Sequence, residues 1–268
     1  MHTIVLATQK GGSGKSTLAI GLALAAKEAG HNVRLIETDQ QGTLSRWQGR
    51  RGIAEPIVET VCGANDIEQR LAALDRGGVT LAIIDTASGV SAATTAAIRH
   101  ADFCMIPARP SIADIEASAA TLSVARAWNK PFAFVLNQTP IRGRRIDCAA
   151  NALGDEAARD MDEVLARPFI VMRNDHQDAL SAGLAVSEFA PFGKSADEIR
   201  DLWKWLELRL ACDVEADAEV EAIAACEEIQ FPIILSPEHV KSPAAEDNAP
   251  RSSPAGGDAI TWALIILV

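Results

Sequence analysis

The sequence predicts an α/β fold in which a doubly wound, mostly parallel sheet is followed by a disordered acidic C-terminal tail. Three observations support this prediction. Short aliphatic runs alternate with longer helical patterns, which is typical of βαβ units. The first run passes into a helix through a glycine-rich turn. Polar residues directly follow several runs, at the strand ends where open parallel sheets place their ligand sites.

The candidate strands are short, mainly apolar runs at 3–8, 33–38, 80–85, 102–107, 132–137 and 168–172. Patterns of helical period lie between and after them, at 16–29, 43–50, 66–76, 91–99, 112–128, 146–164, 175–182 and 195–210. Because helices separate successive strands, we expect neighbouring strands to run parallel.

Composition sets the expected domain organisation. A chain of 268 residues with 48% hydrophobic residues can bury the core of one α/β domain. Its net charge of −11 is uneven, because residues 211–268 hold eleven acidic residues and only two basic ones. We expect a folded domain over 1–210 and an acidic tail over 211–268. The acidity of the tail gives no argument against nucleic-acid binding by the domain.

The tail has three parts. Residues 213–228 are rich in Ala and Glu and suit a helix, whereas residues 232–258 hold five prolines and are expected to be disordered. The apolar residues 259–268 are expected to be a flexible end, with a partner-docking peptide as the alternative.

Cysteine usage and hydropathy indicate the compartment. The five cysteines form no C-x-x-C pair, and the first residues form a candidate strand in place of an export signal. No apolar run approaches the ~20 residues that cross a bilayer. We therefore expect a reduced, cytoplasmic protein without a membrane partner.

The glycine-rich turn after the first strand predicts a phosphate-binding loop. Glycines let backbone N–H groups approach phosphate oxygens, and the helix N-terminus favours negative charge. Lys15 is expected to contact the β- and γ-phosphates of ATP, and Ser16 to ligate Mg²⁺. The predicted ATP-binding residues of the loop are Gly11, Gly12, Ser13, Gly14, Lys15, Ser16 and Thr17. An ordinary P-loop has Gly where this chain has Gln9, and it lacks the second lysine, Lys10.

The two-lysine loop resembles the deviant Walker A motif of the ParA/MinD/nitrogenase-iron-protein family. The resemblance extends over roughly residues 1–210. It implies a P-loop NTPase fold, ATP hydrolysis with Mg²⁺, and a homodimer that forms with ATP. It also implies that Lys10 acts in catalysis with Lys15, because the extra lysine of the family reaches across the dimer to the partner's nucleotide.

Residues Glu37 to Gly42 follow the second candidate strand and resemble the Asp-x-Asp-Pro-Gln-Gly element of the family. Asp39 matches the second aspartate, and a carboxylate there can orient the attacking water. The alternative is that Asp39 caps the following helix. Glu37 stands in place of an aspartate and Gln40 in place of the proline, which implies a looser loop.

The run Leu81 to Asp85 resembles a Walker B strand with Asp85 at its tip. Asp85 is expected to hold Mg²⁺ through a water molecule. The family continues with Thr-Pro-Pro-Gly, whereas this chain reads Thr86-Ala87-Ser88-Gly89. The loss of both prolines predicts a less rigid second loop.

Three further segments extend the resemblance. Residues 106–114 resemble the Pro-x-x-Pro-Ser-x-x-Asp element of the family. Asn137 matches the asparagine that contacts the nucleotide base, with a plain turn residue as the alternative. Residues 191–196 resemble the loop whose backbone borders the adenine.

Arg142, Arg144 and Arg145 form a basic cluster that follows a strand end and opens a helix. Their guanidinium groups can contact DNA phosphates without reading bases, and Arg173 is expected to add to this patch. The alternative is a solvated loop.

Trp47, in a Gly-x-x-x-x-Trp arrangement, resembles the small plasmid partition ATPases that lack an N-terminal helix-turn-helix. That resemblance implies a DNA-segregation ATPase that binds DNA non-specifically in its ATP state, on the nucleoid, and is stimulated by a centromere-binding partner of the ParB type. The alternatives are an ATPase for conjugative or T-DNA transfer and a MinD-like membrane-positioning ATPase. The acidic tail disfavours the last of these, which needs a basic amphipathic helix.

Overall fold

The computed structural model describes residues 1–159 and 161–227. Contacts within the chain group Met1–Ala222 into one compact unit and Ile223–Val268 into another. The proline-rich segment 232–258 and the apolar end 259–268 lie outside the described residues. Nothing in the structure therefore bears on those two expectations.

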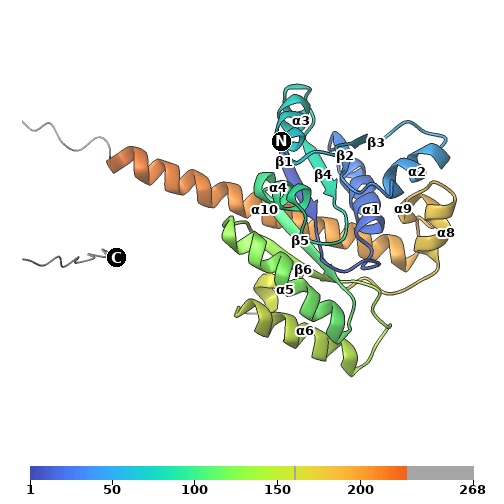
Figure 1. The fold of residues 1–268 in the computed structure, drawn as a ribbon. Helices are drawn as coiled ribbons and strands as arrows, with labels where there is room; N and C mark the ends of the chain where they lie inside the picture. The colour runs from blue at the N-terminus through green and yellow to red at the C-terminus, as the bar shows by residue number, and fades with distance from the viewer. Residues whose placement is uncertain (160, 228–268) are drawn as a thin grey trace, which may run out of the picture. The chain divides into compact units, whose positions relative to one another are not determined.

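A six-stranded parallel sheet forms the middle layer of the first unit, in the order β3-β2-β4-β1-β5-β6 (Figure 1). Its strands are β1 (His2–Leu6), β2 (Val33–Glu37), β3 (Ile57–Thr60), β4 (Leu81–Asp85), β5 (Phe103–Ala108) and β6 (Phe132–Leu136). The doubly wound α/β fold expected from the sequence is confirmed.

Helices cover both faces of the sheet. One face packs against α1 (Lys15–Glu28), α2 (Thr43–Arg50), α8 (Asp175–Ser181), α9 (Val186–Phe189) and the N-terminal part of α10 (Lys194–Glu227). The other packs against α3 (Ala64–Arg76), α4 (Ala92–His100), α5 (Ile112–Ala127), α6 (Arg144–Ala157) and α7 (Met161–Val164). Alternate residues of β1 enter the two cores, which is why parallel strands appear as unbroken apolar runs.

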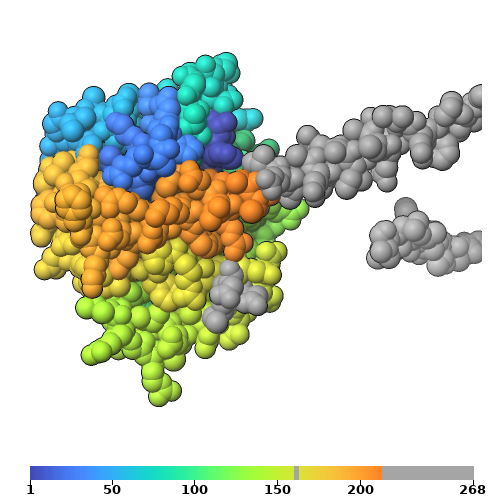
Figure 2. Space-filling model, turned by 180° about the vertical axis from the view of Figure 1, so that it is seen from behind, coloured from blue at the N-terminus to red at the C-terminus, as the bar shows by residue number. Residues whose placement is uncertain are grey.

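The first half of α10 packs closely on α1. In Figure 2 the orange α10 runs across this face of the molecule beside the blue N-terminal segment. A Cβ on Gly21 of α1 would lie 3.1 Å from the Ile199 side chain, so a glycine inside α1 permits this approach. Ile199, Leu202, Trp203 and Leu206 are buried in the same core as α1.

Some expected elements differ from the structure. The strand expected at 168–172 is wrong: only a single bridge, Thr139 to Val171, forms there, and Pro168 has no N–H to extend a ladder. The helix expected at 146–164 is divided into α6 and α7, with Ala158 in the left-handed region (φ 47°) between them. β3 and α9 were not expected from the sequence. The helix expected to end at 210 continues without a break to Glu227, through most of the segment 213–228 that was expected to suit a helix.

Strand order brings the candidate site together. β1 lies between β4 and β5, so the loops that follow these three strands meet at one edge of the sheet. This is the switch point at which open α/β sheets bind ligands. Among the described helices, none has the length and apolarity to cross a membrane.

Candidate active site

The phosphate loop joins β1 to α1 and turns through two glycines in the left-handed region, Gly12 (φ 77°) and Gly14 (φ 91°). A Cβ on Gly14 would lie 2.2 Å from Nδ2 of Asn137, so only glycine fits there. Nδ2 of Asn137 donates to the Ser13 carbonyl at 2.7 Å, and Nε2 of Gln138 donates to the Gly12 carbonyl at 2.9 Å. The end of β6 therefore holds the loop in shape, a role of Asn137 and Gln138 that the sequence analysis did not foresee.

Ser16 and Asp85 form an oxygen-rich pair at the start of α1. Ser16 Oγ donates to Asp85 Oδ2 at 2.6 Å, while Asp85 Oδ1 is buried without a hydrogen-bond partner among the described residues. Burial raises the pKa of Asp85 to about 7, although the Ser16 hydrogen bond and the charge of Lys15 oppose this shift. A hydroxyl beside an incompletely paired carboxylate fits Mg²⁺, a hard cation that prefers oxygen ligands. Bound there, Mg²⁺ would supply charge neutralisation for phosphate oxygens.

Lys15 is buried at the first position of α1, where its Nζ donates to Ser88 Oγ at 3.2 Å. Burial lowers the pKa of Lys15, while the charges of Asp85 and Asp39 raise it. A phosphate group would give this buried ammonium strong charge-assisted hydrogen bonds. Ser88 was not among the site residues expected from the sequence. Its hydroxyl stands where the family has a proline, which offers no such acceptor.

Glu37, the last residue of β2, and Asp39, two residues further on, have different roles. The Glu37 carboxylate is fully buried and accepts hydrogen bonds from the backbone N–H groups of Leu44 at 2.6 Å and Ser45 at 3.1 Å. It thereby caps α2, so the alternative that Asp39 caps this helix is wrong. Asp39 is half-buried and accepts only from the N–H of Gln41, at 2.9 Å, among the described residues. Its second oxygen remains available to a ligand or water.

Lys10 lies at the mouth of the loop against an acidic residue 104 positions away. Its Nζ donates to Asp114 Oδ2 at 3.1 Å, and Asp114 is only 2% exposed. Arg109 and Ser111 donate to the same carboxylate. Burial works to raise the pKa of Asp114, but the hydrogen bonds from Arg109, Ser111 and Lys10 prevail and hold it at about 2. Asp114 is thus a fixed negative charge shared by two cations.

A cavity of about 110 Å³ opens beside the loop. It lies between Gly14 and Thr17 on one side and the segment Ile170–Leu180 on the other, with Asn137 in its wall. His176 also lines it, and its buried Nε2 has no hydrogen-bond partner among the described residues. Its walls combine aliphatic side chains, among them Leu18 and Ile170, with polar ones, and such a mixed lining suits a nucleotide base. Residues 191–196, the expected adenine loop, do not line this cavity. Within that loop, Ser195 Oγ donates a hydrogen bond to Asp175 Oδ2 at the start of α8, at 2.9 Å.

The arginines of the expected basic patch differ in whether they have an ion-pair partner. Arg142, Arg144 and Arg145 are exposed around the start of α6 and form no ion pair within the described part of the chain. Arg173 lines the cavity, and its Nη1 lies 2.6 Å from Glu198 Oε2 in an ion pair. Its guanidinium is therefore engaged, unlike those of the other three.

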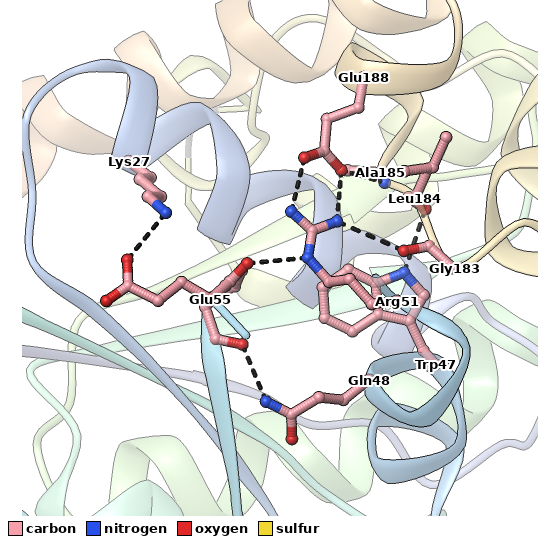
Figure 3. A network of polar contacts seen from close by, with 10 residues as sticks. Lys27, Trp47, Gln48, Arg51, Glu55, Gly183, Leu184, Ala185 and Glu188 are labelled. Atoms are coloured by element: carbon pink, nitrogen blue, oxygen red, sulfur yellow. Dashed lines mark hydrogen bonds and ion pairs between the residues drawn. The ribbon is translucent and has the colours of Figure 1, made fainter. Parts of the chain in front are cut away.

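A network of polar contacts joins the C-terminal end of α2 to residues 183–188 (Figure 3). Arg51 donates to both carboxylate oxygens of Glu188 at 2.6 Å, and also to the Gly183 and Glu55 carbonyls. Its guanidinium lies 5.0 Å from the centre of the Trp47 ring. The neighbouring Arg50 donates twice to the carbonyl of Leu180, a residue of the cavity. The helix that follows Asp39 is thus fixed to α8, a connection the sequence analysis did not predict.

Comparison with known proteins places this site in a family. The model of the CobQ/CobB/MinD/ParA nucleotide-binding domain matches residues 4–186. The chain is 27% identical over 213 residues to maintenance of carboxysome distribution protein A of Halothiobacillus neapolitanus, covering 75% of this chain and 94% of that protein. It is 29% identical over 125 residues to protein ParA of Rhizobium radiobacter, covering 46% of this chain and 56% of that protein.

Solved structures share the fold. Apo McdA of Cyanothece superposes with a TM-score of 0.63 at 19% identity, covering 75% of this chain and 99% of that one. The cell division ATPase MinD of Pyrococcus furiosus gives a TM-score of 0.60 at 16% identity, covering 77% and 98%. The matched residues 4–186 include the two-lysine loop, Asp39 and Asp85. The chain is a Mg²⁺-dependent ATP hydrolase of the ParA/MinD type, and it belongs to the CobQ/CobB/MinD/ParA nucleotide-binding domain family.

Proposed function

We propose that this ATPase is a nucleotide-operated switch for DNA partition, as in plasmid or chromosome segregation. In the ATP state it forms a homodimer, binds DNA of any sequence and associates with the nucleoid in the cytoplasm. A centromere-binding adaptor of the ParB type then stimulates hydrolysis and resets it. Residues 1–210 act as the ATPase domain and residues 211–268 as an acidic tail. The position of Lys10 supports the switch most directly. Its side chain lies at the mouth of the loop and is 37% exposed, so a partner subunit could reach it.

Each residue of the site has a defined task in this proposal. Lys15 and the loop N–H groups bind the phosphates, and Ser16 with Asp85 holds Mg²⁺. Asp39 orients the attacking water. It is free for this role because Glu37 already accepts the hydrogen bonds from the N-terminus of α2. Lys10 completes the site of the partner subunit. Asn137 lines the proposed base cavity and, through its hydrogen bond to the Ser13 carbonyl, fixes the position of the loop beside it.

The proposed DNA contact is the exposed arginine cluster at the start of α6. Arg142, Arg144 and Arg145 are solvent-exposed and unpaired within the described residues, as phosphate-contacting side chains must be before binding. Arg173 is left out of this surface because it is paired with Glu198. A twofold dimer would present the cluster twice.

A second candidate function is the positioning of a protein cargo. The similarity to the carboxysome distribution protein favours it, because that match spans 94% of the relative. The two functions share the ATP switch and differ in the partner that stimulates hydrolysis. A partner bound to its own DNA site supports partition, whereas one that stimulates hydrolysis without such a site supports cargo positioning.

DNA binding by the purified full-length protein tests the proposal. With ATP and Mg²⁺ we expect binding of random-sequence duplex DNA, and little binding with ADP or without nucleotide. Asp39→Ala is expected to keep ATP-dependent DNA binding while it loses turnover. Replacing Arg142, Arg144 and Arg145 together by Ala should weaken binding on all sequences and flatten the salt dependence by roughly 0.9 in log–log slope for each lost phosphate contact.

Lys204→Ala is a matched control, because Lys204 is an exposed cation on α10 away from the cluster. It should leave DNA affinity nearly unchanged. Equal DNA binding with and without ATP would contradict the switch. A triple variant that binds like the parent would show that the DNA surface lies elsewhere on the protein.

A further inference from the structure

Arg109 is a third cation at the mouth of the phosphate loop, beside Lys10 and Lys15. It follows directly after β5, and its Nε and Nη2 both donate to the Asp114 carboxylate, at 2.9 and 3.2 Å. Two nitrogens on one carboxylate fix the plane of the guanidinium. The side chain is 33% exposed, whereas Asp114 is 2% exposed. Arg109 is therefore held at the surface by a buried anchor.

The remaining nitrogen of Arg109 faces the loop. A Cβ placed on Gly12 would lie 3.8 Å from Arg109 Nη1. Within the described residues, Nη1 makes no hydrogen bond, although Nε and Nη2 are both used. A guanidinium presents five donors in a rigid fork, so fixing one edge on Asp114 points the other edge at a predictable place. That place is the backbone of the phosphate loop.

Charge at this point favours an anion. Lys10 and Arg109 share the single carboxylate of Asp114, so the three groups carry a net positive charge. The N-terminus of α5 does not depend on Arg109, because Ser111 already caps it by accepting from the Asp114 N–H. Arg109 thus adds a cation that the capping of α5 does not require.

We propose that Arg109 is a further phosphate-binding residue, which uses Nη1 to contact the terminal phosphate of the nucleotide bound at this mouth, with Asp114 as its positioning residue. The inference rests on nucleotide binding by the loop. It assigns to Arg109 the discrimination between ATP and ADP, because only ATP carries the phosphate nearest the mouth. Lys15 and the loop N–H groups serve both nucleotides.

Calorimetry of the full-length protein with Mg²⁺ and either a slowly hydrolysed ATP analogue or ADP tests this. For Arg109→Ala we expect affinity for the ATP analogue to fall by roughly tenfold or more, as for the loss of a charged hydrogen bond. Affinity for ADP should change by less than about twofold. Arg109→Lys, which keeps the charge but cannot hold Asp114 with two nitrogens, should give a smaller loss in the same direction.

Arg76→Ala is the matched control, since it removes an exposed arginine in the last turn of α3, outside this mouth. It should leave both affinities unchanged. A parent-like ratio of ATP to ADP affinity in both Arg109 variants would overturn the inference and leave Arg109 as a support for Asp114. A parent protein that binds neither nucleotide would instead overturn the assignment of the loop itself, so the two failures are distinguishable.

Discussion

Two groups of buried charges in this protein differ in how completely they are paired. Around Arg51, both oxygens of Glu188 and two backbone carbonyls accept from one guanidinium, and Glu188 also accepts from the Ala185 N–H. Around the phosphate loop, Asp85 is buried with one oxygen lacking a partner among the described residues. The first group is satisfied within the chain, whereas the second is not.

The pKa shifts follow the same division. Burial works to raise the pKa of Glu188, but the Arg51 and Ala185 hydrogen bonds outweigh it and lower that pKa. Burial raises the pKa of Asp85 and lowers that of Lys15, so both charged forms are disfavoured where they stand. We infer that the Arg51 network stabilises the fold, while the loop gives up stability in order to bind phosphate and Mg²⁺.

The largest expected effect is on activity, from Lys15→Met. This change keeps most of the unbranched side chain and removes its charged end, so ATP hydrolysis should fall by on the order of 10³-fold. Stability should be unchanged or slightly higher, because burial disfavours the ammonium that is removed. ATPase assays together with urea unfolding measure both quantities. Clear destabilisation of this variant would break the contrast between the two regions.

Glu188→Gln is expected to have the opposite effects, with a loss of stability and little change in ATP hydrolysis. It leaves Arg51, whose side chain is 2% exposed, without its counter-charge. Leaving a buried charge without its partner costs up to about 3 kcal/mol in the free energy of unfolding. Turnover per folded molecule should stay near the parent value, because Glu188 contacts none of the residues assigned to phosphate or Mg²⁺.

The control for this variant is Glu28→Gln, which breaks the more exposed pair with Arg200. That change should cost less than about 1 kcal/mol. If both variants lose the same free energy of unfolding, the Arg51 network contributes no more to stability than an exposed ion pair.

The smallest effect is expected from His176→Gln, at the cavity beside the phosphate loop. Burial lowers the pKa of His176 below 6.5, helped by Arg173 and opposed by Glu198 and Asp175. The unfolded chain then binds the proton more readily, so this contribution to stability is present above about pH 6.5 and is lost as the pH falls. When the pH is lowered from about 7.5 to about 5.5, the variant should lose less free energy of unfolding than the parent.

Urea midpoints at the two pH values measure this difference. Asp85 contributes with the opposite sign, because its raised pKa makes the folded state bind the proton more tightly. It is present in both proteins, so its contribution cancels in the comparison. Equal pH dependence in parent and variant would contradict the burial of a neutral His176.

Short segments of sequence were enough to predict the parts of the site that consecutive residues specify. The two-lysine loop and Asp85 each lie at the end of an apolar run, and parallel strands bring such ends to one edge. The edge strand β3 (Ile57–Thr60) was not predicted because none of its residues is buried and only its first two residues are apolar. The segment 168–172 has such a run, but the pattern does not show that its pairing is limited to single bridges.

The sequence by itself determined the fold class, the phosphate loop and the strand-end positions, because periodicity and glycine spacing encode burial and local backbone shape. Only the tertiary structure decided which partner each charged group has. Lys10 lies 104 residues from Asp114 and Arg51 lies 137 residues from Glu188. Arg173 forms its ion pair with Glu198, 25 residues further along the chain. Such pairs depend on how separate elements pack in space, and a one-dimensional pattern contains many carboxylates that would serve each cation equally well.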